Sequence, residues 1–253
     1  MGAWRDLTLN SRERMAIYSA REIKDGDIIL VGVGLPNLAA NFAKRVYSPN
    51  LTLVYESGSI DCFPRRQPLS IGDSSLSENV VALYPIFEMF SYIISGERID
   101  VGYLGAAQVD SKGKLNTTVI GDYDSPMVRL PGSGGACEIM SSAKKSVVMT
   151  EFTDEKFRER VDYITSSLAM GNQGDNSHSR DEVIVTDRCI IKLNRYREAE
   201  VSYIYEGVDA DEIRKLASKI GISFPEEIQV LEDPREEEVR ILREMDLMRT
   251  YLK

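Results

Sequence analysis

The sequence has 253 residues, of which 43% are hydrophobic and 28% are charged, and its formal net charge at pH 7 is −9. Such a chain can bury one large core, and its acidic balance argues against nucleic acid as a partner, because DNA binding needs a basic face. No apolar run approaches the ~20 residues that span a bilayer, and the polar N-terminus lacks the apolar segment of a secretion signal, so we expect a cytoplasmic protein without a membrane partner.

The first part of the chain is expected to alternate between helices and strands. Helices are predicted over 9–25 and 35–46, and strands over 27–33 and 51–56. Gly26 ends the first helix, and Pro36 lies in the first turn of the second, where proline is tolerated. The run DIILVGV is short and apolar, as expected of a strand buried on both faces. This alternation predicts an α/β fold with a largely parallel sheet that helices cover on both faces.

The same pattern continues through the rest of the chain. We expect a loop over 57–80, a helix over 85–95, a strand over 99–109, a turn at 112–114, a glycine loop over 132–136, a helix over 137–143 and a strand over 146–152. Residues 181–194 alternate around Thr186 and predict a hairpin at an edge of the sheet. Helices are predicted over 208–220 and 235–251, packed on the domain or extending it. Without repeats or linkers, residues 1–253 are interpreted as one domain.

Three features lie at predicted strand ends, where ligands bind in open α/β sheets. Gly32 and Gly34 form a strand-to-helix turn that lets the backbone approach a ligand near a helix N-terminus. Glu56 ends an apolar strand, and Gly58 after it leaves room for a bulky substrate. The run GSGGA at 132–136 supplies consecutive N–H groups that can hold a phosphate or an oxyanion. Each feature alone could instead have an ordinary structural role. The turn at Gly32 and Gly34 could serve packing, Glu56 could pair with a cation, and the run at 132–136 could be a flexible connection.

Histidine and cysteine usage excludes several kinds of site. The only histidine, His178, lies in a polar stretch that we interpret as an exposed loop, and one histidine cannot build a His-rich zinc or iron site. We therefore expect no metal. Cys62, Cys137 and Cys189 are widely spaced without a CxxC pair, which favours reduced thiols over disulfides.

Six motifs occur in a characteristic order. They are VGVGLP at 31–36, KRVY at 44–47, VYESG at 54–58 followed by Asp61-Cys62, GAAQVDSKGKLNTTVIGDYDSP at 105–126, GSGGA at 132–136 and VDYIT at 161–165. With them the sequence resembles the class I coenzyme A transferases, specifically the B-type (beta) chain of the glutaconate type, over nearly its whole length. The C-terminal tail matches least, and the loop over 166–182 is shortened and altered. The resemblance implies the CoA-transferase fold and a CoA-transferase activity.

The resemblance also implies a mechanism with Glu56 as the acyl acceptor. Its carboxylate would attack an acyl-CoA, and CoA would then be held as a glutamyl thioester until a second acid, a dicarboxylate or a 3-oxo acid, takes it. Acyl-CoA is a substrate in this scheme, and no tightly bound cofactor is expected. We expect Gly134, Gly135 and Ala136 to supply oxyanion donors.

Other residues of the expected site bound its pocket. Gly32, Gly34 and Gly132 are expected to shape the CoA-binding pocket, and Gln108 is either a polar contact of the substrate or a structural residue. Basic side chains at 65–66, 112 and 144–145 could contact CoA phosphates, although solvated surface is the favoured interpretation.

A partner chain is expected because one motif of the family is missing. The A (alpha) subunit of these enzymes carries a glycine-rich motif of the GGF kind, and this chain has none. We therefore expect a hetero-oligomer with an A subunit. The alternatives are an acyl-CoA hydrolase or decarboxylase of the same superfamily, and a non-catalytic scaffold; a glutamate at position 56 argues against both.

Overall fold

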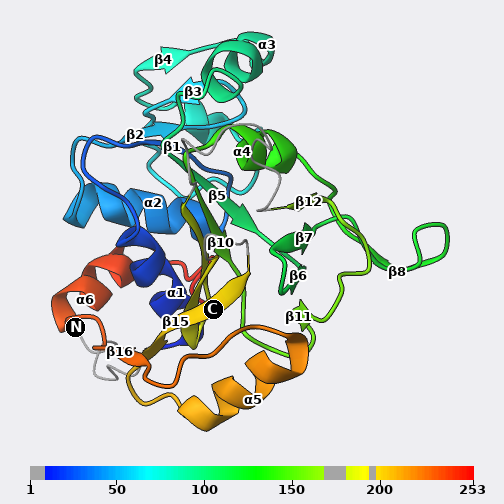
Figure 1. Ribbon diagram of the computed structural model, residues 1–253. Coiled ribbons are helices and arrows are strands. Elements are labelled where there is room, and N and C mark those ends of the chain that lie inside the picture. The colour runs from blue at the N-terminus through cyan, green and yellow to red at the C-terminus, as the bar shows by residue number, and fades with distance from the viewer. Residues whose placement is uncertain (1–8, 168–180, 194–197) are drawn as a thin grey trace.

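The computed structural model describes residues 9–167, 181–193 and 198–253, and a ten-stranded sheet runs through them (Figure 1). Five adjacent strands at its centre are parallel: β13 (Asp181–Val185), β10 (Lys145–Met149), β5 (Val101–Gly105), β1 (Ile28–Leu30) and β2 (Thr52–Val54). The flanking strands are β3 (Ser59–Ile60) and β4 (Ala82–Leu83) on one side, and β14 (Cys189–Leu193), β15 (Ala199–Tyr205) and β16 (Gln229–Leu231) on the other. The expected α/β class with a mostly parallel sheet is confirmed.

Successive side chains of a central strand point to opposite faces of the sheet and therefore pack into two different hydrophobic cores. Val147 of β10 packs on the side of α1 (Ser11–Ala20), α2 (Leu35–Val46) and α6 (Glu236–Met245). Val148, one residue later, packs on the side of α4 (Ala136–Ser142) and α5 (Ala210–Ile220). Helices therefore cover both faces of the sheet, as predicted (Figure 1).

The helix predictions differ in accuracy. The predicted helix over 35–46 has the bounds of α2. The helix predicted over 9–25 ends at Ala20, because Ile23 turns into the core and the Lys24 N–H donates to the Asp27 carboxylate at 2.8 Å. The helix predicted over 85–95 is divided into α3 (Ile86–Glu88) and a π-helix, Met89–Ile94.

Two strand predictions are wrong in their arrangement. The run 99–109 splits into β5 and β6 (Gln108–Asp110), and β6 belongs to a separate four-stranded sheet. The hairpin of β13 and β14 exists, but it is not at an edge, because β15 and β16 continue the sheet beyond it. Residues 199–205 form strand β15, which the sequence does not predict, so the sheet extends further than expected.

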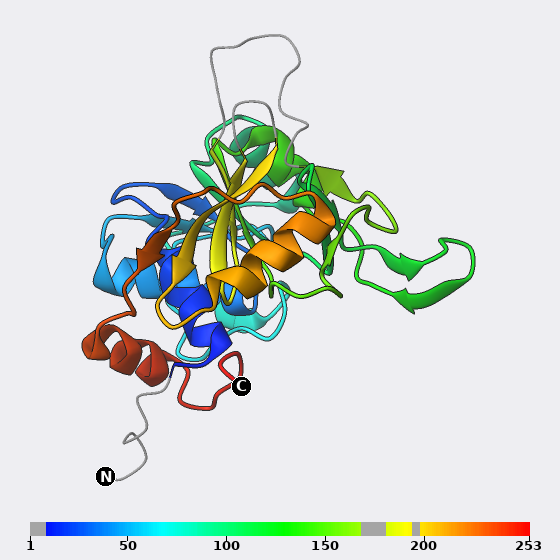
Figure 2. The ribbon, with the colours of Figure 1, turned by 60° about the horizontal axis from the view of Figure 1, so that its bottom comes forward.

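A second region of the structure consists of a small sheet and a hairpin, and the sequence did not predict their short strands. The small sheet contains β11 (Phe157–Arg158), β6, β7 (Lys114–Asn116) and β12 (Ser166–Ser167). A hairpin of β8 (Val119–Gly121) and β9 (Pro126–Arg129) projects from the body of the molecule (Figure 2). Strand β6 follows β5 after two residues, and the Gly132 N–H donates to the Thr117 carbonyl directly after β7, so the glycine loop at 132–136 lies beside this region.

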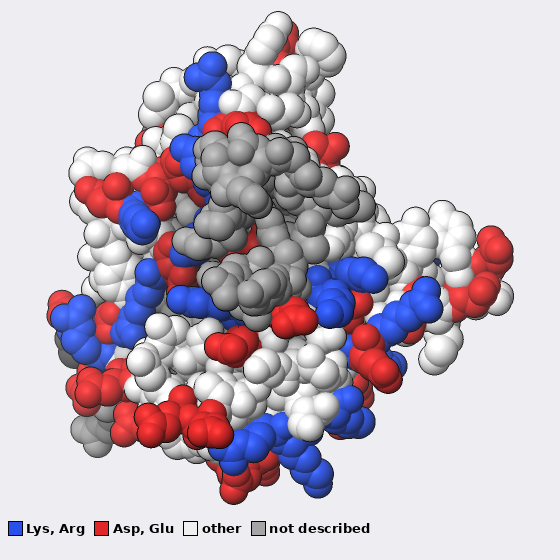
Figure 3. All heavy atoms as spheres, in the orientation of Figure 1, with Lys and Arg blue, Asp and Glu red and all other residues white. Residues whose placement is uncertain are grey.

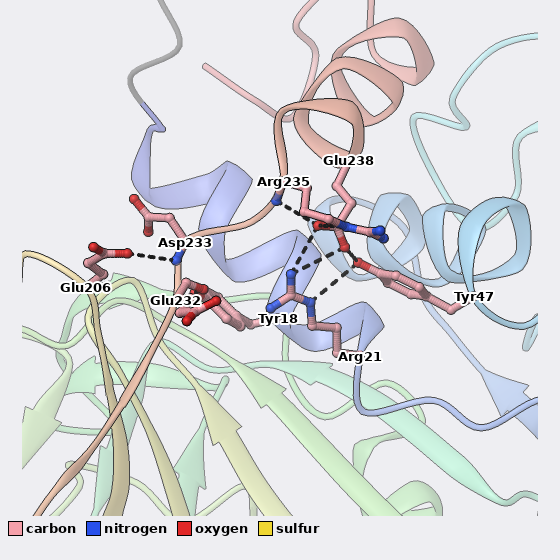
Figure 4. A network of polar contacts seen from close by, with 8 residues as sticks. All are labelled: Tyr18, Arg21, Tyr47, Glu206, Glu232, Asp233, Arg235 and Glu238. Atoms are coloured by element: carbon pink, nitrogen blue, oxygen red, sulfur yellow. Dashed lines mark hydrogen bonds and ion pairs between the residues drawn. The ribbon is translucent and has the colours of Figure 1, made fainter.

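A buried polar network attaches α6 to the first two helices (Figure 4). Glu238 is 2% exposed and accepts hydrogen bonds from Tyr47, from Arg21 at 3.2 Å and from the Arg235 N–H at 2.7 Å. Burial, aided by the bond to Glu238, raises the pKa of Tyr47 to about 12. Burial would raise the pKa of Glu238 as well, but these donors outweigh it and hold that pKa below its ordinary value.

On the face in Figure 3, acidic and basic side chains lie next to one another over most of the described surface. None of the helices in the described parts of the chain has the length and apolar character of a membrane span. Among the described residues, a run of exposed apolar and aromatic side chains follows β4 into α3. Its members are Val81, Leu83, Tyr84, Ile86, Phe87 and Tyr92.

Candidate active site

The local chain path fixes Glu56 at the carboxyl end of a parallel strand. Strand β2 ends at Val54, and the fully buried Tyr55 anchors the next step by donating from its hydroxyl to Asn37 Oδ1 at 2.7 Å. The chain then reverses, because the Gly58 N–H donates to the Tyr55 carbonyl at 2.9 Å. Gly58 has φ +106°, and a Cβ there would overlap the carbonyl oxygen of Tyr84, so glycine is required. Glu56 is thus held in a tight turn between β2 and β3.

The carboxylate of Glu56 meets the glycine loop, which comes from a distant part of the chain. The Gly135 N–H donates to Glu56 Oε1 at 3.2 Å. Within the described parts of the chain, Glu56 forms no ion pair with lysine or arginine. Burial raises the pKa of Glu56 above its ordinary value; the Gly135 bond opposes that rise and the nearby Glu138 adds to it. The carboxylate is therefore desolvated without a counter-charge, unlike an ordinary surface ion pair.

A cavity of about 440 Å³ opens beside this carboxylate. Gly32, Gly132, Gly134 and Ala136 of the predicted site line it together with Glu56. The other lining residues are mostly apolar: Val33, Ile71, Leu104, Gly105, Ala106, Ala107, Thr117, Leu130, Pro131 and Ser133. A cavity with a mostly apolar lining and one carboxylate at its edge is typical of a small-molecule site.

The glycine loop is positioned by Thr117, which the sequence analysis missed. The Thr117 hydroxyl donates to the Gly132 carbonyl at 2.7 Å, and the Gly132 N–H donates to the Thr117 carbonyl at 2.8 Å. Gly132 has φ +97° and Gly134 has φ +48°, which are conformations that favour glycine. No local pattern marks Thr117, because its role depends on the pairing of two segments 15 residues apart.

The backbone donors of this loop are not equivalent. The Ala136 N–H donates to the Ser133 carbonyl at 2.9 Å, the Gly132 N–H is used by Thr117, and the Gly135 N–H reaches Glu56. Among the described hydrogen bonds, the Gly134 N–H is not occupied by the protein. Of the three donors expected from the sequence, the Ala136 N–H is thus used within the loop, the Gly135 N–H is bonded to Glu56, and the Gly134 N–H has no partner among the described hydrogen bonds.

Two predicted site residues lie elsewhere. Gly34 is the N-cap of α2 at φ +89° and does not line the cavity. Gln108 is 1% exposed; its side chain donates to Asp162 at 2.9 Å and accepts from Asn116 at 2.8 Å. The geometry therefore favours the structural alternative for Gln108, as a bridge within the small sheet.

Several basic residues considered for CoA phosphates form ion pairs away from this cavity. Lys144 pairs with Asp100 at 2.7 Å, and Lys145 pairs with Glu22 at 2.5 Å. The Lys112 ammonium lies 3.9 Å from a Glu198 carboxylate oxygen. His178, together with the rest of 168–180, is outside the described residues. In the parts that the structure describes, no group of three His, Cys, Asp or Glu side chains could hold a metal ion.

Comparisons with known proteins show which family and which fold the chain is similar to. A family model described as "Coenzyme A transferase" matches residues 12–216. The B-type chain of 3-oxoadipate CoA-transferase from Pseudomonas knackmussii is 39% identical over 244 residues, which cover 94% of this chain and 93% of the relative. The crystal structure of glutaconate coenzyme A-transferase from Acidaminococcus fermentans superposes with a TM-score of 0.81 at 26% identity, covering 97% of this chain and 98% of that one. The decarboxylase AibA/AibB shares the fold with a TM-score of 0.81 at 22% identity, covering 96% and 98%.

Proposed function

The chain belongs to the coenzyme A transferase family, as a B-type subunit, and from that premise we propose that it moves CoA between an acyl-CoA and a carboxylic acid through a glutamyl-CoA thioester on Glu56. The acids proposed are dicarboxylates or 3-oxo acids, and the resemblance to a 3-oxoadipate enzyme supports a substrate that is both. The chain acts together with an A subunit in this proposal.

The observation that carries the proposal is the half-buried Glu56 carboxylate at the mouth of an apolar cavity, where no described lysine or arginine forms an ion pair with it. A carboxylate oxygen attacks the thioester carbonyl carbon, the C–S bond breaks, and an acyl-glutamyl anhydride and CoA thiolate result. The thiolate then attacks the glutamyl carbonyl carbon, which releases the first acid as its carboxylate and leaves a glutamyl thioester. The acceptor acid reverses both steps. Each intermediate is an activated acyl group, so no external oxidant or metal is required.

The glycine loop suits the second attack in particular. When the thiolate attacks the Glu56 carbonyl, one glutamyl oxygen becomes the oxyanion. The Gly135 N–H already lies 3.2 Å from Oε1, so it is placed to stabilise that charge as it develops. Removing one such donor typically lowers turnover by ~10²–10³.

The raised pKa of Glu56 also fits a nucleophilic role. Desolvation leaves the carboxylate with fewer stabilising partners in its resting state, and a more basic carboxylate is a stronger nucleophile. The Glu56 carboxylate is poorly stabilised in the free protein. Forming a bond to an acyl group removes its charge and therefore removes this cost of desolvation.

Covalent labelling tests the proposal directly. Mixing the complex of this chain and its A subunit with acyl-CoA should leave an adduct with the mass of CoA on the Glu56 peptide, which mass spectrometry detects. Borohydride should reduce the thioester and inactivate the enzyme. Glu56→Ala should abolish exchange, and Glu56→Asp should lose about 10²-fold, because the shorter side chain withdraws the carboxylate by roughly 1 Å. A Glu56→Ala complex that still exchanged CoA between acids would refute the assignment.

A hydrolase or decarboxylase is the second candidate, supported by the shared fold of the decarboxylase AibA/AibB. The fate of CoA separates the candidates: transfer places it on the acceptor acid, hydrolysis releases it as free thiol, and decarboxylation releases carbon dioxide while the thioester survives. We expect CoA on the acceptor acid because Glu56 offers a site that can hold it between the two half-reactions.

A further inference from the structure

A second cavity, of about 560 Å³, lies between the last turns of α2, the segment 63–67 and the end of α6. We call it the basic groove. Its lining residues are Asn41, Lys44, Arg45, Pro49, Phe63, Pro64, Arg65, Arg66, Gln67, Glu244 and Met245. Four of these carry a positive charge and one a negative charge, in a chain whose net charge is −9. A local excess of positive charge in an acidic protein indicates an anionic ligand.

The cations of the basic groove differ in how far they are already neutralised. Lys44 pairs with Asp61, and Arg66 makes two bonds to the Asp73 carboxylate, at 2.7 and 2.8 Å. Arg65 is exposed and uses its backbone N–H for a bond to Glu78 at 2.9 Å, and among the described ion pairs its guanidinium takes no part. Arg65 is therefore the cation with most capacity for a ligand phosphate.

Arg45 is the second available cation. Its guanidinium lies 3.8 Å from Glu244, and both side chains are at least half exposed, so the pair is weak. A doubly charged phosphate placed in the basic groove would compete well with a single exposed carboxylate for this guanidinium. Arg45 and Arg65 come from opposite walls, α2 and the segment 63–67, and so can contact the same ligand from two sides.

An aromatic ring lies in the same cavity. Phe63 is 49% exposed, and the ammonium of Lys44 lies 4.8 Å from the centroid of its ring. Purine bases stack on accessible aromatic rings of this kind, and an arginine or lysine beside the ring adds to that stacking. The combination therefore points to a phosphorylated adenosine rather than to a free phosphate ion.

The basic groove is built before any ligand arrives. The Phe63 N–H donates to the Glu78 carbonyl at 3.0 Å, and Asn37 donates to the Gln67 side chain at 2.8 Å. Gln67 in turn donates to the Met245 carbonyl at 3.4 Å, which joins two walls of the cavity. A rigid site loses less entropy when a ligand binds than a flexible one.

The basic groove and the Glu56 cavity are joined by one short segment. Gln67 lines the first and Ile71 lines the second, and four residues of chain span at most about 14 Å. A CoA thioester carries its reactive group at one end and a phosphorylated adenosine at the other, joined by a flexible arm. We propose that the basic groove binds the 3′-phosphate and adenosine end of the CoA whose thioester meets Glu56. This assignment rests on the proposed transferase function and adds a recognition site to it.

Calorimetric titration with adenosine 3′,5′-bisphosphate tests the site without catalysis. The full chain should bind this probe, and Arg65→Ala should weaken binding about 10-fold, the loss expected for one hydrogen-bonded charge at a partly exposed site. Arg65→Lys should restore part of it. Phe63→Leu should weaken the nucleotide but not inorganic phosphate, because only the base needs the ring. Arg214→Ala, which removes an exposed arginine of α5, is the matched control and should change nothing.

Kinetics of the assembled enzyme supply the second arm. Arg65→Ala should raise KM for acyl-CoA by about the same factor with kcat unchanged, and it should leave the turnover of an acyl-pantetheine thioester unaltered, since that substrate lacks the nucleotide. Equal KM values for wild type and Arg65→Ala with acyl-CoA would overturn the assignment. So would tight binding of ATP that does not compete with acyl-CoA, because the basic groove would then be a separate nucleotide site. If the complex exchanged no CoA but Arg65→Ala still weakened CoA binding, the transferase proposal would fail and the binding site would stand.

Discussion

Replacing Gly135 by alanine should disable chemistry while leaving the fold intact. The backbone at Gly135 has φ −83° and ψ 13°, which lies in a region that residues other than glycine also adopt. A Cβ at this position, however, would lie 2.9 Å from Cδ of Glu56 and closer still to Oε1. Ordinary van der Waals contact begins at about 3.4 Å, so the carboxylate oxygen must withdraw by about 1 Å.

The size of the effect follows from that displacement. Misplacing a reacting group by about 1 Å can cost ~10²-fold, which corresponds to about 2.7 kcal/mol in the activation barrier. The free energy of unfolding should change by less than about 1 kcal/mol, because two effects oppose each other. Alanine restricts the unfolded chain, which stabilises the fold, but it is a poorer N-cap for α4 than glycine, which destabilises it. The substitution is therefore expected to raise the activation barrier much more than it changes the free energy of unfolding.

The assay compares turnover and thermal stability in the same preparations. CoA exchange by the assembled enzyme should fall about 100-fold in Gly135→Ala, the CoA adduct on Glu56 should form correspondingly slowly, and the melting temperature should stay within a few degrees. Gly72→Ala is the matched control, since it has open space for a Cβ and lies outside the cavity lining. Near-normal turnover in a folded Gly135→Ala enzyme would refute the contact between Glu56 and the glycine loop as a catalytic arrangement.

Three further outcomes are expected. Exchange activity should rise with pH through the raised pKa of Glu56, because only the ionised carboxylate attacks; an acid limb of kcat/KM at or below the ordinary glutamate value, about 4.3, would contradict that rise. Glu238→Gln should lower the free energy of unfolding by about 2 kcal/mol at neutral pH, because it weakens charged hydrogen bonds such as that from Tyr47. Since the pKa of Glu238 is lowered in the folded state, its stabilisation is present above the ordinary glutamate pKa and is lost as pH falls, so the difference between variant and wild type in urea unfolding should shrink in acid. Glu13→Gln should lower the free energy of unfolding by about 2 kcal/mol, because it removes the charge of a buried carboxylate that accepts a hydrogen bond from the Arg243 guanidinium at 2.7 Å; a melting temperature within about two degrees of wild type would show that other contacts of Arg243 suffice.

Sequence reasoning succeeded where a local pattern determines the structure. The apolar run before Glu56 ended in a real parallel strand, and Pro36 marked the start of α2 because proline fits a first helical turn. The hairpin at Thr186 was found for a similar reason: its two strands are adjacent in the chain, and each is five residues long.

Sequence reasoning failed where pairing joins distant segments. Strand β11 pairs Phe157 with Val109, 48 residues earlier, and strands of two or three residues show no periodicity. The contact of Gly135 with Glu56 spans 79 residues, so the glycine run suggested N–H donors but could not say which one reaches the carboxylate. The basic groove combines residues near 44, 65 and 244, and the sequence offered no reason to bring them together.

The two ends of the described chain are fastened to each other. The Asn10 side chain donates to the Leu252 carbonyl at 3.1 Å, and Arg12 donates to the Tyr251 carbonyl at 3.0 Å. A short peptide linker could therefore join them, and new termini could be opened at the exposed tip of the β8–β9 hairpin. A circular permutant of this kind would keep every strand pairing of the main sheet. A protein fused to its new termini would be attached at the β8–β9 hairpin instead of beside α6.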